Sequence, residues 1–162
     1  MNDNEKAVEK LNDLLEKNYD ARNGYKKALE DVDDPSLRRY FEHRAEQRST
    51  FATELDNKIR SCGGEPKESG SVTGAVHRTW MDIRSAMAGD NKEEAILKEC
   101  IRGDKASAEE YQEAMDKDYI DADTKALIQQ EKANVDQTLS QIRSMEDVRE
   151  YYSSESPTPP QM

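Results

Sequence analysis

The 162-residue sequence predicts an all-α protein, a bundle of four long helices that run up, down, down and up, with a short extra helix in the connection between the second and the third. Apolar residues recur at mixed spacings of three and four over long segments, which is typical of helices with one buried face. No segment shows the alternation expected of a half-buried strand. The 7 glycines and 5 prolines fall mostly between the periodic segments, so they mark helix ends.

The first two long helices are predicted over residues 4–32 and 35–62. Between them, Asp34 reads as an N-cap and Pro35 as the first residue of the second helix. Because this break is so short, the two helices form an antiparallel hairpin. Gly24 lies inside the first helix, where it costs about 1 kcal/mol relative to alanine, and we expect a close approach of a neighbouring helix to explain it.

The loop CGGEPKESGS follows, and the remaining helices are predicted over 72–88, 91–117 and 122–150. The last two also form a hairpin, because only a short turn separates them. Residues 1–150 then make one domain, and the tail 151–162 is expected to be disordered or extended. Two hairpins joined by one long crossover connection make the ferritin-like arrangement of a four-helix bundle.

Five segments carry a resemblance to a known family. They are LNDLLEKNYDARNGYKKALEDV, DPSLRRYFEHRAEQRSTFATEL, CGGEP, SGSVTGAVHRTWM and, more weakly, ECIRGDKASAEEYQEAM. The chain is similar over roughly residues 5–145 to the bacterial ferritin-like four-helix-bundle proteins described only as a domain of unknown function. The resemblance implies the fold, and it brings no established activity.

The charge balance excludes some partners. There are 24 basic and 35 acidic residues, a net charge of -11, which argues against binding to nucleic-acid phosphates or to an anionic membrane surface. No segment approaches the roughly 20 apolar residues of a membrane span. The N-terminus has no apolar signal core, so we expect a cytoplasmic protein. Cys62 and Cys100 are too few for a disulfide framework, although a single bridge between them stays open.

Polar residues lie at mid-length on the inward faces of the long helices, where a bundle is normally apolar. They are Asn18, Arg22, Arg44, Arg48, Asp104, Glu131 and Thr138. A buried charge costs several kcal/mol unless it is paired. We therefore predict a polar layer in which the three arginines pair with the two acids, with the Asn and Thr completing the hydrogen bonds, and which fixes the register of the helices. The alternative is that the arginines extend to solvent from a loosely packed seam.

The same positions bear on metal binding. Di-iron proteins of this fold use a Glu from each of two helices and Glu-x-x-His from the other two. Here Arg22 occupies the central position of the first helix, and Arg48 and Phe51 fall where the second helix needs Glu-x-x-His. Only Asp104 and Glu131 remain as weak metal candidates, and arginines lie beside them. We expect no cofactor, and iron only if the di-iron alternative holds.

Other reactive residue types have simpler interpretations. His43 is predicted to be exposed. His77 is predicted to pack the short helix, with binding of a metal or ligand in a groove under the crossover as the alternative. The tyrosines at helical spacing are predicted to be core residues whose hydroxyls reach the polar layer, with a redox path near iron as the alternative; these are Tyr19, Tyr25, Tyr40 and Tyr111. No nucleophile elbow, P-loop or Rossmann turn is present in the sequence, so no catalytic residue is predicted.

Three functional hypotheses follow. The first is a non-catalytic bundle that associates with itself or with a protein partner through its acidic faces or the region around Trp80. The second is a di-iron oxidase or an iron store, which the fold would allow. The third is a binder of a small anion, with the central arginines as a clamp.

Overall fold

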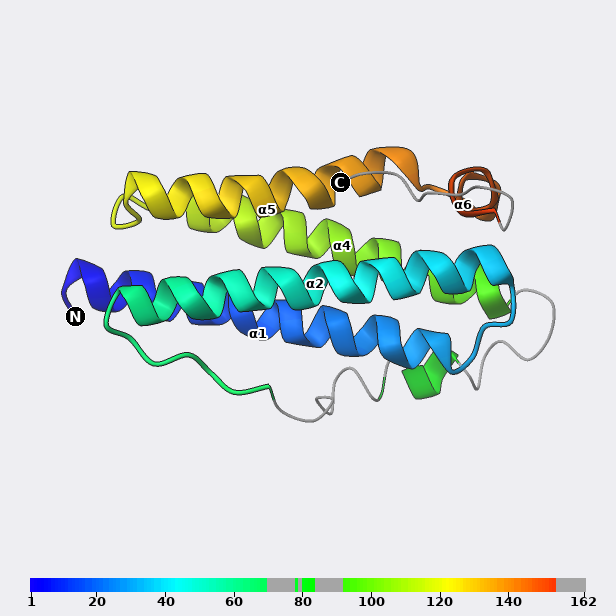
Figure 1. Ribbon diagram of the computed structural model, residues 1–162, viewed down its shortest axis with the longest axis horizontal. Helices are drawn as coiled ribbons and strands as arrows, with labels where there is room; N and C mark the ends of the chain where they lie inside the picture. Colours follow the sequence, from blue (N-terminus) through cyan, green and yellow to red (C-terminus); the bar gives the residue numbers. More distant parts are fainter. Residues whose placement is uncertain (70–77, 79, 84–91, 154–162) are drawn as a thin grey trace.

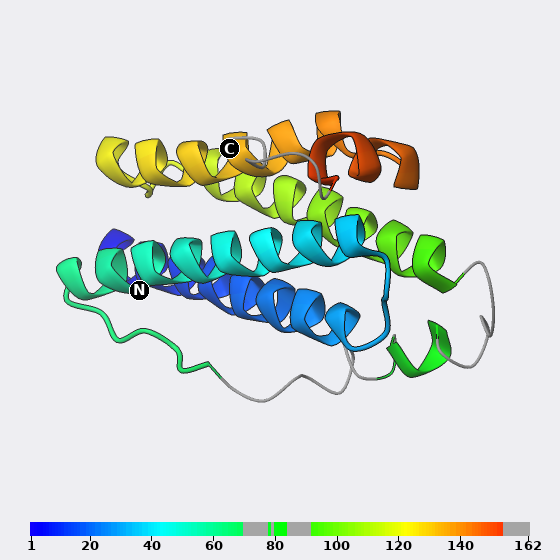
Figure 2. The same cartoon turned by 45° about the vertical axis from the view of Figure 1, so that its right-hand side comes forward.

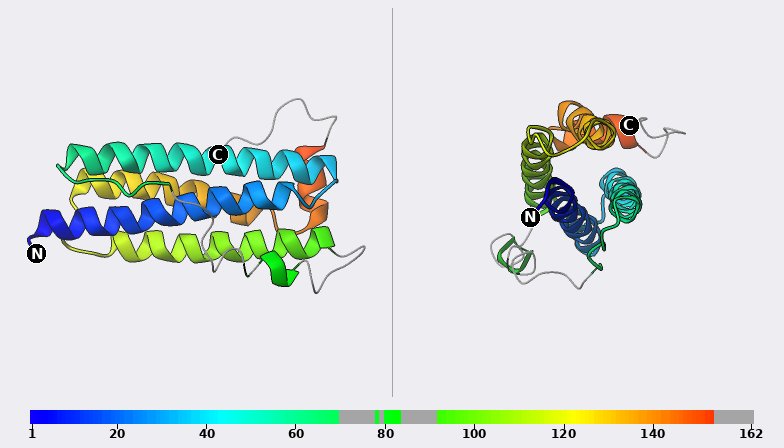
Figure 3. Two further views of the ribbon diagram at one scale, coloured as in Figure 1. Left: turned by 90° about the horizontal axis from the view of Figure 1, so that it is seen from below. Right: turned by 90° about the vertical axis from the view of Figure 1, so that its left-hand side faces the viewer.

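The computed structural model describes residues 1–69, 78, 80–83 and 92–153, and this part of the chain is all-helical, as predicted (Figure 1). Its helices are α1 (Asp3–Leu29), α2 (Pro35–Ser61), α4 (Lys92–Met115), α5 (Ala122–Gln141) and α6 (Met145–Tyr152). In Figure 1, α1 and α5 run in one direction and α2 and α4 in the other. The end-on view in Figure 3 shows the four long helices side by side, with α1 packed against both α2 and α4.

Four of the described helices, α1, α2, α5 and α6, begin with a side chain that caps them. Asn2, Asp34, Asp121 and Ser144 each accept a hydrogen bond from the backbone N–H three residues further on. Such a bond satisfies one of the N–H groups that a helix start leaves open. The predicted cap at Asp34 and the start of α2 at Pro35 are confirmed. The first helix ends at Leu29, three residues before the predicted end, because the chain must already turn toward α2.

The turn of the first hairpin is fastened to the second half of the chain. At the start of α4, Glu93 accepts hydrogen bonds from the backbone N–H groups of Asp33 and Asp34, at 2.6 and 2.9 Å. From α6, a guanidinium nitrogen of Arg149 lies 3.3 Å from Asp34 Oδ2. Contacts between residues far apart in sequence thus hold this end of the molecule together.

The predicted continuous helix over 122–150 is wrong, because α5 ends at Gln141 and α6 starts anew. Ile142 adopts extended backbone angles, φ -114° and ψ 103°, and Ser144 caps the new helix. Figure 1 shows α6 turned across the end of the bundle. Ile142 and Val148 are both buried in the broken arrangement. Their spacing in the sequence therefore fits a continuous helix and a helix that breaks after Gln141 equally well. The predicted tail boundary is also wrong, because Tyr151 and Tyr152 belong to α6 and Tyr152 is 1% exposed; the rest of the predicted tail, from residue 154, lies outside the described residues.

After α2, the chain runs back along α1 in an extended connection (Figure 2). Asn12 holds this connection on both sides: its Nδ2 donates to the carbonyl oxygen of Glu65 at 3.1 Å, and its Oδ1 accepts from the N–H of Lys67 at 2.8 Å. The predicted loop is therefore present, at least to residue 69. Of the helix predicted over 72–88, residues 78 and 80–83 are described and helical; the rest, including His77, lies outside the described ranges.

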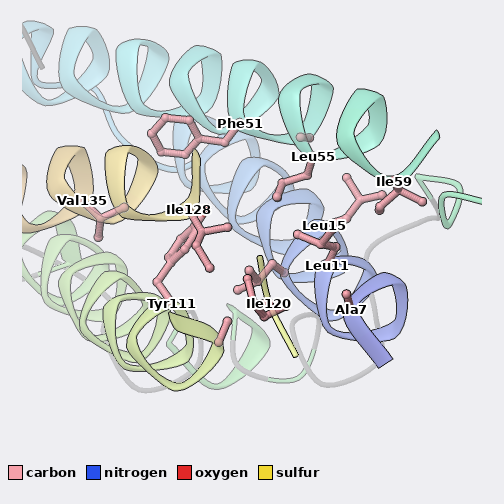
Figure 4. Packing of buried hydrophobic residues seen from close by; sticks show 13 residues of the cluster. Ala7, Leu11, Leu15, Phe51, Leu55, Ile59, Tyr111, Ile120, Ile128 and Val135 are labelled. Carbon is pink, nitrogen blue, oxygen red and sulfur yellow. The ribbon is translucent and has the colours of Figure 1, made fainter. Parts of the chain in front are cut away.

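The buried apolar side chains form two clusters, one toward each end of the bundle. The first, shown in Figure 4, contains Ala7, Leu11, Leu14, Leu15, Phe51, Ala52, Leu55, Ile59, Tyr111, Ala114, Ile120, Ile128 and Val135. The second contains Tyr25, Ala28, Val32, Leu37, Tyr40, Phe41, Ala45, Trp80, Ile96, Leu97, Ile142, Val148 and Tyr152. Along α1, α2 and α4 the two clusters occupy different segments, and polar residues lie between them.

Two features bear on the surface and on redox chemistry. Both cysteines are free thiols, so the bridge that stayed open is not formed. No helix in the described part of the chain is long and apolar enough to span a lipid bilayer.

We predict that Gly64→Ala destabilises the fold by about 1–3 kcal/mol, because the new methyl group overpacks the contact between the connection and α1. A Cβ at Gly64 would lie 2.6 and 2.8 Å from the two methyl carbons of Val8. The χ1 angle of a helical valine is nearly fixed, so Val8 cannot rotate away without strain. Urea unfolding followed by circular dichroism measures the change.

Gly24→Ala is the matched control, because a Cβ there meets nothing within 4 Å. Gly24 lies inside α1, so alanine should stabilise the protein by roughly 0.5–1 kcal/mol. Equal unfolding midpoints for the Gly64→Ala variant and the wild type would contradict the contact argument.

Candidate functional site

A buried polar layer lies between the two apolar clusters. Six of the seven side chains predicted for it are buried: Asn18, Arg44, Arg48, Asp104, Glu131 and Thr138. They come from all four long helices. Both of the buried arginines are 0% exposed, which excludes for them the alternative that they extend to solvent.

Arg48 is the centre of this layer. Its Nη2 donates to Asp104 Oδ1 at 2.7 Å, and its Nη1 donates to Asn18 Oδ1 at 2.9 Å. The Nδ2 of Asn18 donates in turn to the Tyr111 hydroxyl at 2.9 Å, and the Tyr25 hydroxyl donates to the second oxygen of Asp104. A side chain of α2 is thereby tied to α1 and α4 through charge-assisted hydrogen bonds, which are the stronger kind.

Arg44 lies one turn before Arg48 and is held by other partners. Its Nη1 donates to Oε1 of Gln47, and Tyr25, Tyr40 and Asp104 lie near its charge. Burial by itself lowers the pKa of Arg44, but the neighbouring Tyr25 and Asp104 outweigh it and hold the pKa above its ordinary value. The guanidinium therefore stays charged in the core.

Glu131 joins the layer through a tyrosine. The Tyr111 hydroxyl donates to Glu131 Oε1 at 2.7 Å, while Oε2 is buried without a hydrogen-bond partner in the described part of the chain. Burial raises the pKa of Glu131 to about 9; the Tyr111 hydrogen bond opposes this shift, and the Glu54 carboxyl adds to it. Glu131 is thus protonated near neutral pH, and its predicted ion pair with an arginine is replaced by the bond to Tyr111.

Glu54 is a member of this neighbourhood that the sequence did not reveal. It lies on α2 and is partly buried. Glu54 follows Arg48 by six residues, so on the helix it lies to one side of the buried face that carries Arg44 and Arg48. Only the position of α5 against α2 brings Glu54 near Glu131.

Arg22 differs from its prediction. It is partly exposed, and its guanidinium donates to the Ser69 hydroxyl and lies 4.9 Å from the ring centroid of Tyr19. The crossover connection passes close to α1, and it offers a polar partner outside the core. Thr138 is buried as predicted, and its hydroxyl donates to the Asn134 carbonyl of its own helix at 3.1 Å.

His43 also differs from its prediction as an exposed residue. It is partly buried, and its Nδ1 lies 2.9 Å from the Tyr152 hydroxyl. Burial, followed by the charge of Arg44, lowers the pKa of His43. The reason for the difference is α6, which crosses α2 only because the chain breaks after Gln141.

The layer does not fit a di-iron centre. One oxygen of Asp104 accepts from Arg48 and the other from Tyr25, and Glu131 keeps its proton. A di-iron site needs several anionic oxygen ligands together with histidine nitrogens. Within residues 1–69, 78, 80–83 and 92–153, no group of three or more His, Cys, Asp or Glu side chains could hold a metal ion.

A groove of about 300 Å³ opens between α1 and α4 and reaches the layer at Tyr25 and Asp104. Gly24 and Gly103 line it from the two helices, and Trp80 lines it from the crossover segment. A Cβ built at either glycine meets nothing within 4 Å. The expected close helix approach at Gly24 is therefore wrong, because the glycines border open space.

We predict that Arg48→Ala destabilises the protein by roughly 3–5 kcal/mol, because it leaves the carboxylate of Asp104 buried without its cation. Asp104 is 2% exposed, so water cannot replace the lost partner without rearrangement of the helices. Chemical unfolding at neutral pH measures the change.

Arg102→Ala is the matched control on an exposed pair, since Arg102 bonds Glu99 at the surface of α4. Such pairs contribute about 0–1 kcal/mol. An Arg48→Ala unfolding curve that superimposes on the wild-type curve would refute the role given to the layer.

Stability should fall as the pH rises from about 4.5 to 9. The folded-state pKa of Glu131 is about 9 against an ordinary value of 4.5, so in this window the folded protein binds a proton that the unfolded chain has lost. The slope from one such group reaches about 1.4 kcal/mol per pH unit. Glu131→Gln removes this contribution, and urea unfolding at several pH values measures it.

Glu109→Gln, an exposed carboxyl on α4, should leave the slope unchanged. If the Glu131→Gln variant and the wild type lose stability with pH at the same rate, Glu131 does not hold the buried proton.

Comparison with known proteins gives a family and adds no activity. Comparison with curated proteins gives no match. Residues 6–117, which include most of α1 and all of α2 and α4, match a family model described as a domain of unknown function, DUF2383. This match spans more than half of the sequence, and the chain therefore belongs to the DUF2383 family.

Proposed function

We propose that this chain is a non-catalytic, ferritin-like four-helix bundle that acts by association with another protein or with itself, and that an ionic network occupies the place of a metal centre. The observation that carries the proposal is the pairing of fully buried Arg48 with Asp104 and Asn18. This pairing neutralises the carboxylate of Asp104 in the middle of the bundle, where a di-iron centre would need free carboxylates.

The helix order supports the ferritin-like part of the proposal. The hairpin of α1 and α2 and the hairpin of α4 and α5 are joined by the long connection that follows Ser61. In this order the helices run up, down, down and up, which requires one crossover along the bundle.

The chemistry of the buried groups supports a non-catalytic bundle. Arg44 and Arg48 bring two positive charges to the centre, and a divalent cation placed there would be repelled by both. The di-iron alternative has Asp104 and Glu131 as its ligands, and these are the groups that the network engages. The small-anion alternative needs accessible guanidinium groups, whereas both are 0% exposed.

Association is favoured by the surface charge. The net charge of -11 repels a second copy and attracts a partner with a basic surface. Met81, which follows buried Trp80 in the chain, is exposed and adds an apolar contact surface. A basic protein is accordingly the partner that we expect, with self-association as the second choice.

Metal analysis of protein grown with excess iron tests the proposal, together with absorption spectra after ferrous iron and oxygen are added. We expect less than one iron per chain and no change in the rate of ferrous oxidation over buffer. Two irons per chain, or accelerated oxidation, would overturn the non-catalytic assignment. Light scattering then distinguishes the modes of association: a mass near 18.5 kDa favours a separate partner, and a multiple of it favours self-association.

A further inference from the structure

We propose that the groove between α1 and α4 binds a small organic cation with an apolar body, of the class of aromatic amines. The inference does not rest on the proposed association, and the groove meets the ionic network only at its floor, where Tyr25 and Asp104 line it. Three observations carry it: the open space at two facing glycines, the aromatic wall, and an unpaired carboxylate.

The first observation is that two glycines line the groove, although packing between α1 and α4 does not require a glycine at either position. Gly24 and Gly103 lie inside long helices, where each costs about 1 kcal/mol relative to alanine. Facing helices commonly use glycine to approach closely, but nothing lies within 4 Å of a Cβ at either position. Both glycines instead line the same space of about 300 Å³, the lower end of the range of ligand pockets.

The second observation is the character of the walls. Trp80 and Tyr25 are both nearly fully buried and line the groove, with Ala21 and Ala106 between the charged rim residues. Ligand pockets typically have such a lining, apolar and aromatic with few polar groups. The face of a tryptophan also attracts a cation held within about 6 Å.

The third observation is the balance of charge at the rim. Lys17 pairs with Glu110 at 3.7 Å, and Arg102 pairs with Glu99. Asp20 lines the groove and makes no salt bridge or side-chain hydrogen bond with any residue that the structure describes. The charge left for a ligand is therefore negative.

The surroundings of Asp20 point the same way. It is partly buried, and burial, with the nearby charge of Glu16, raises the pKa of its carboxyl against the smaller, opposing effect of Lys17, whose own ion pair is with Glu110. A cation beside Asp20 would relieve both effects. At the floor, the oxygens of Asp104 are already engaged by Arg48 and Tyr25, so they orient no ligand. An anion finds no free positive group among the described lining residues, since both basic ones are paired.

The test uses three probes of similar shape and different charge: 2-phenylethylamine, 2-phenylethanol and 3-phenylpropionate. Trp80 is the single tryptophan of the chain, so its emission reports occupancy of the groove directly. We expect a saturable change with the amine, at least tenfold weaker binding of the alcohol, and the weakest binding with the carboxylate. No saturable change with the amine, or tightest binding of the carboxylate, would overturn the proposal.

Two variants show where the amine binds. Gly103→Leu fills the groove and improves helix propensity, so it should keep or raise the melting temperature while weakening amine binding at least tenfold. Asp20→Asn should bring the affinities for amine and alcohol to within about twofold of each other. Asp13→Asn, an exposed acid two turns earlier on α1, is the control and should bind the amine as wild type does. Unchanged binding in the Gly103→Leu variant, whose fold the melting curve checks, would place the amine elsewhere and refute the site.

Discussion

The fold depends on one buried cation. Arg48 reaches from α2 to Asp104 on α4 and to Asn18 on α1, at 2.7 and 2.9 Å, in a region that water does not enter. The apolar clusters on either side are less demanding, because hydrophobic contacts are not directional and tolerate small slips. If one helix slid by a turn, about 5.4 Å, a charge would be left without its partner. The network therefore defines the level at which three helices meet.

Two guanidinium groups are buried in the layer. Arg44 and Arg48 are cationic, Asp104 pairs with Arg48, and Glu131 keeps its proton. Tyrosine hydroxyls link the two buried acids to the rest of the layer: Tyr25 donates to Asp104, and Tyr111 accepts from Asn18 and donates to Glu131. Because a hydroxyl can donate and accept at once, Tyr111 extends the network from an amide to an acid.

The sequence predicted the parts of the layer that one helix determines by itself. Asn18, Arg44, Arg48 and Asp104 lie near the centre of apolar stripes, and a stripe shows which side of its own helix is buried. Arg22 was misplaced because a partner outside the bundle, Ser69, is available to it. A stripe gives no information on the path of a connecting segment.

The features that were missed depend on contacts between helices. Glu54 gains its role only when α5 lies against α2, and the groove exists only because Gly24 and Gly103 come from helices that face each other. The end of α5 was missed for a different reason. An extended Ile142 and a helical one both bury that side chain, and the capping bond from Asp147 N–H to Ser144 selects the break.

The position of α6 has a consequence for the order of events during synthesis. Tyr152 packs on Tyr40 of α2, and Arg39 of the same helix bonds the backbone of Ser153. Tyr40 of the first hairpin is thus covered only by residues that are synthesised more than a hundred positions later. A nascent chain halted after Gln141 would hold its four long helices and still lack the residue that covers Tyr40, and exposed apolar surface of this kind promotes aggregation.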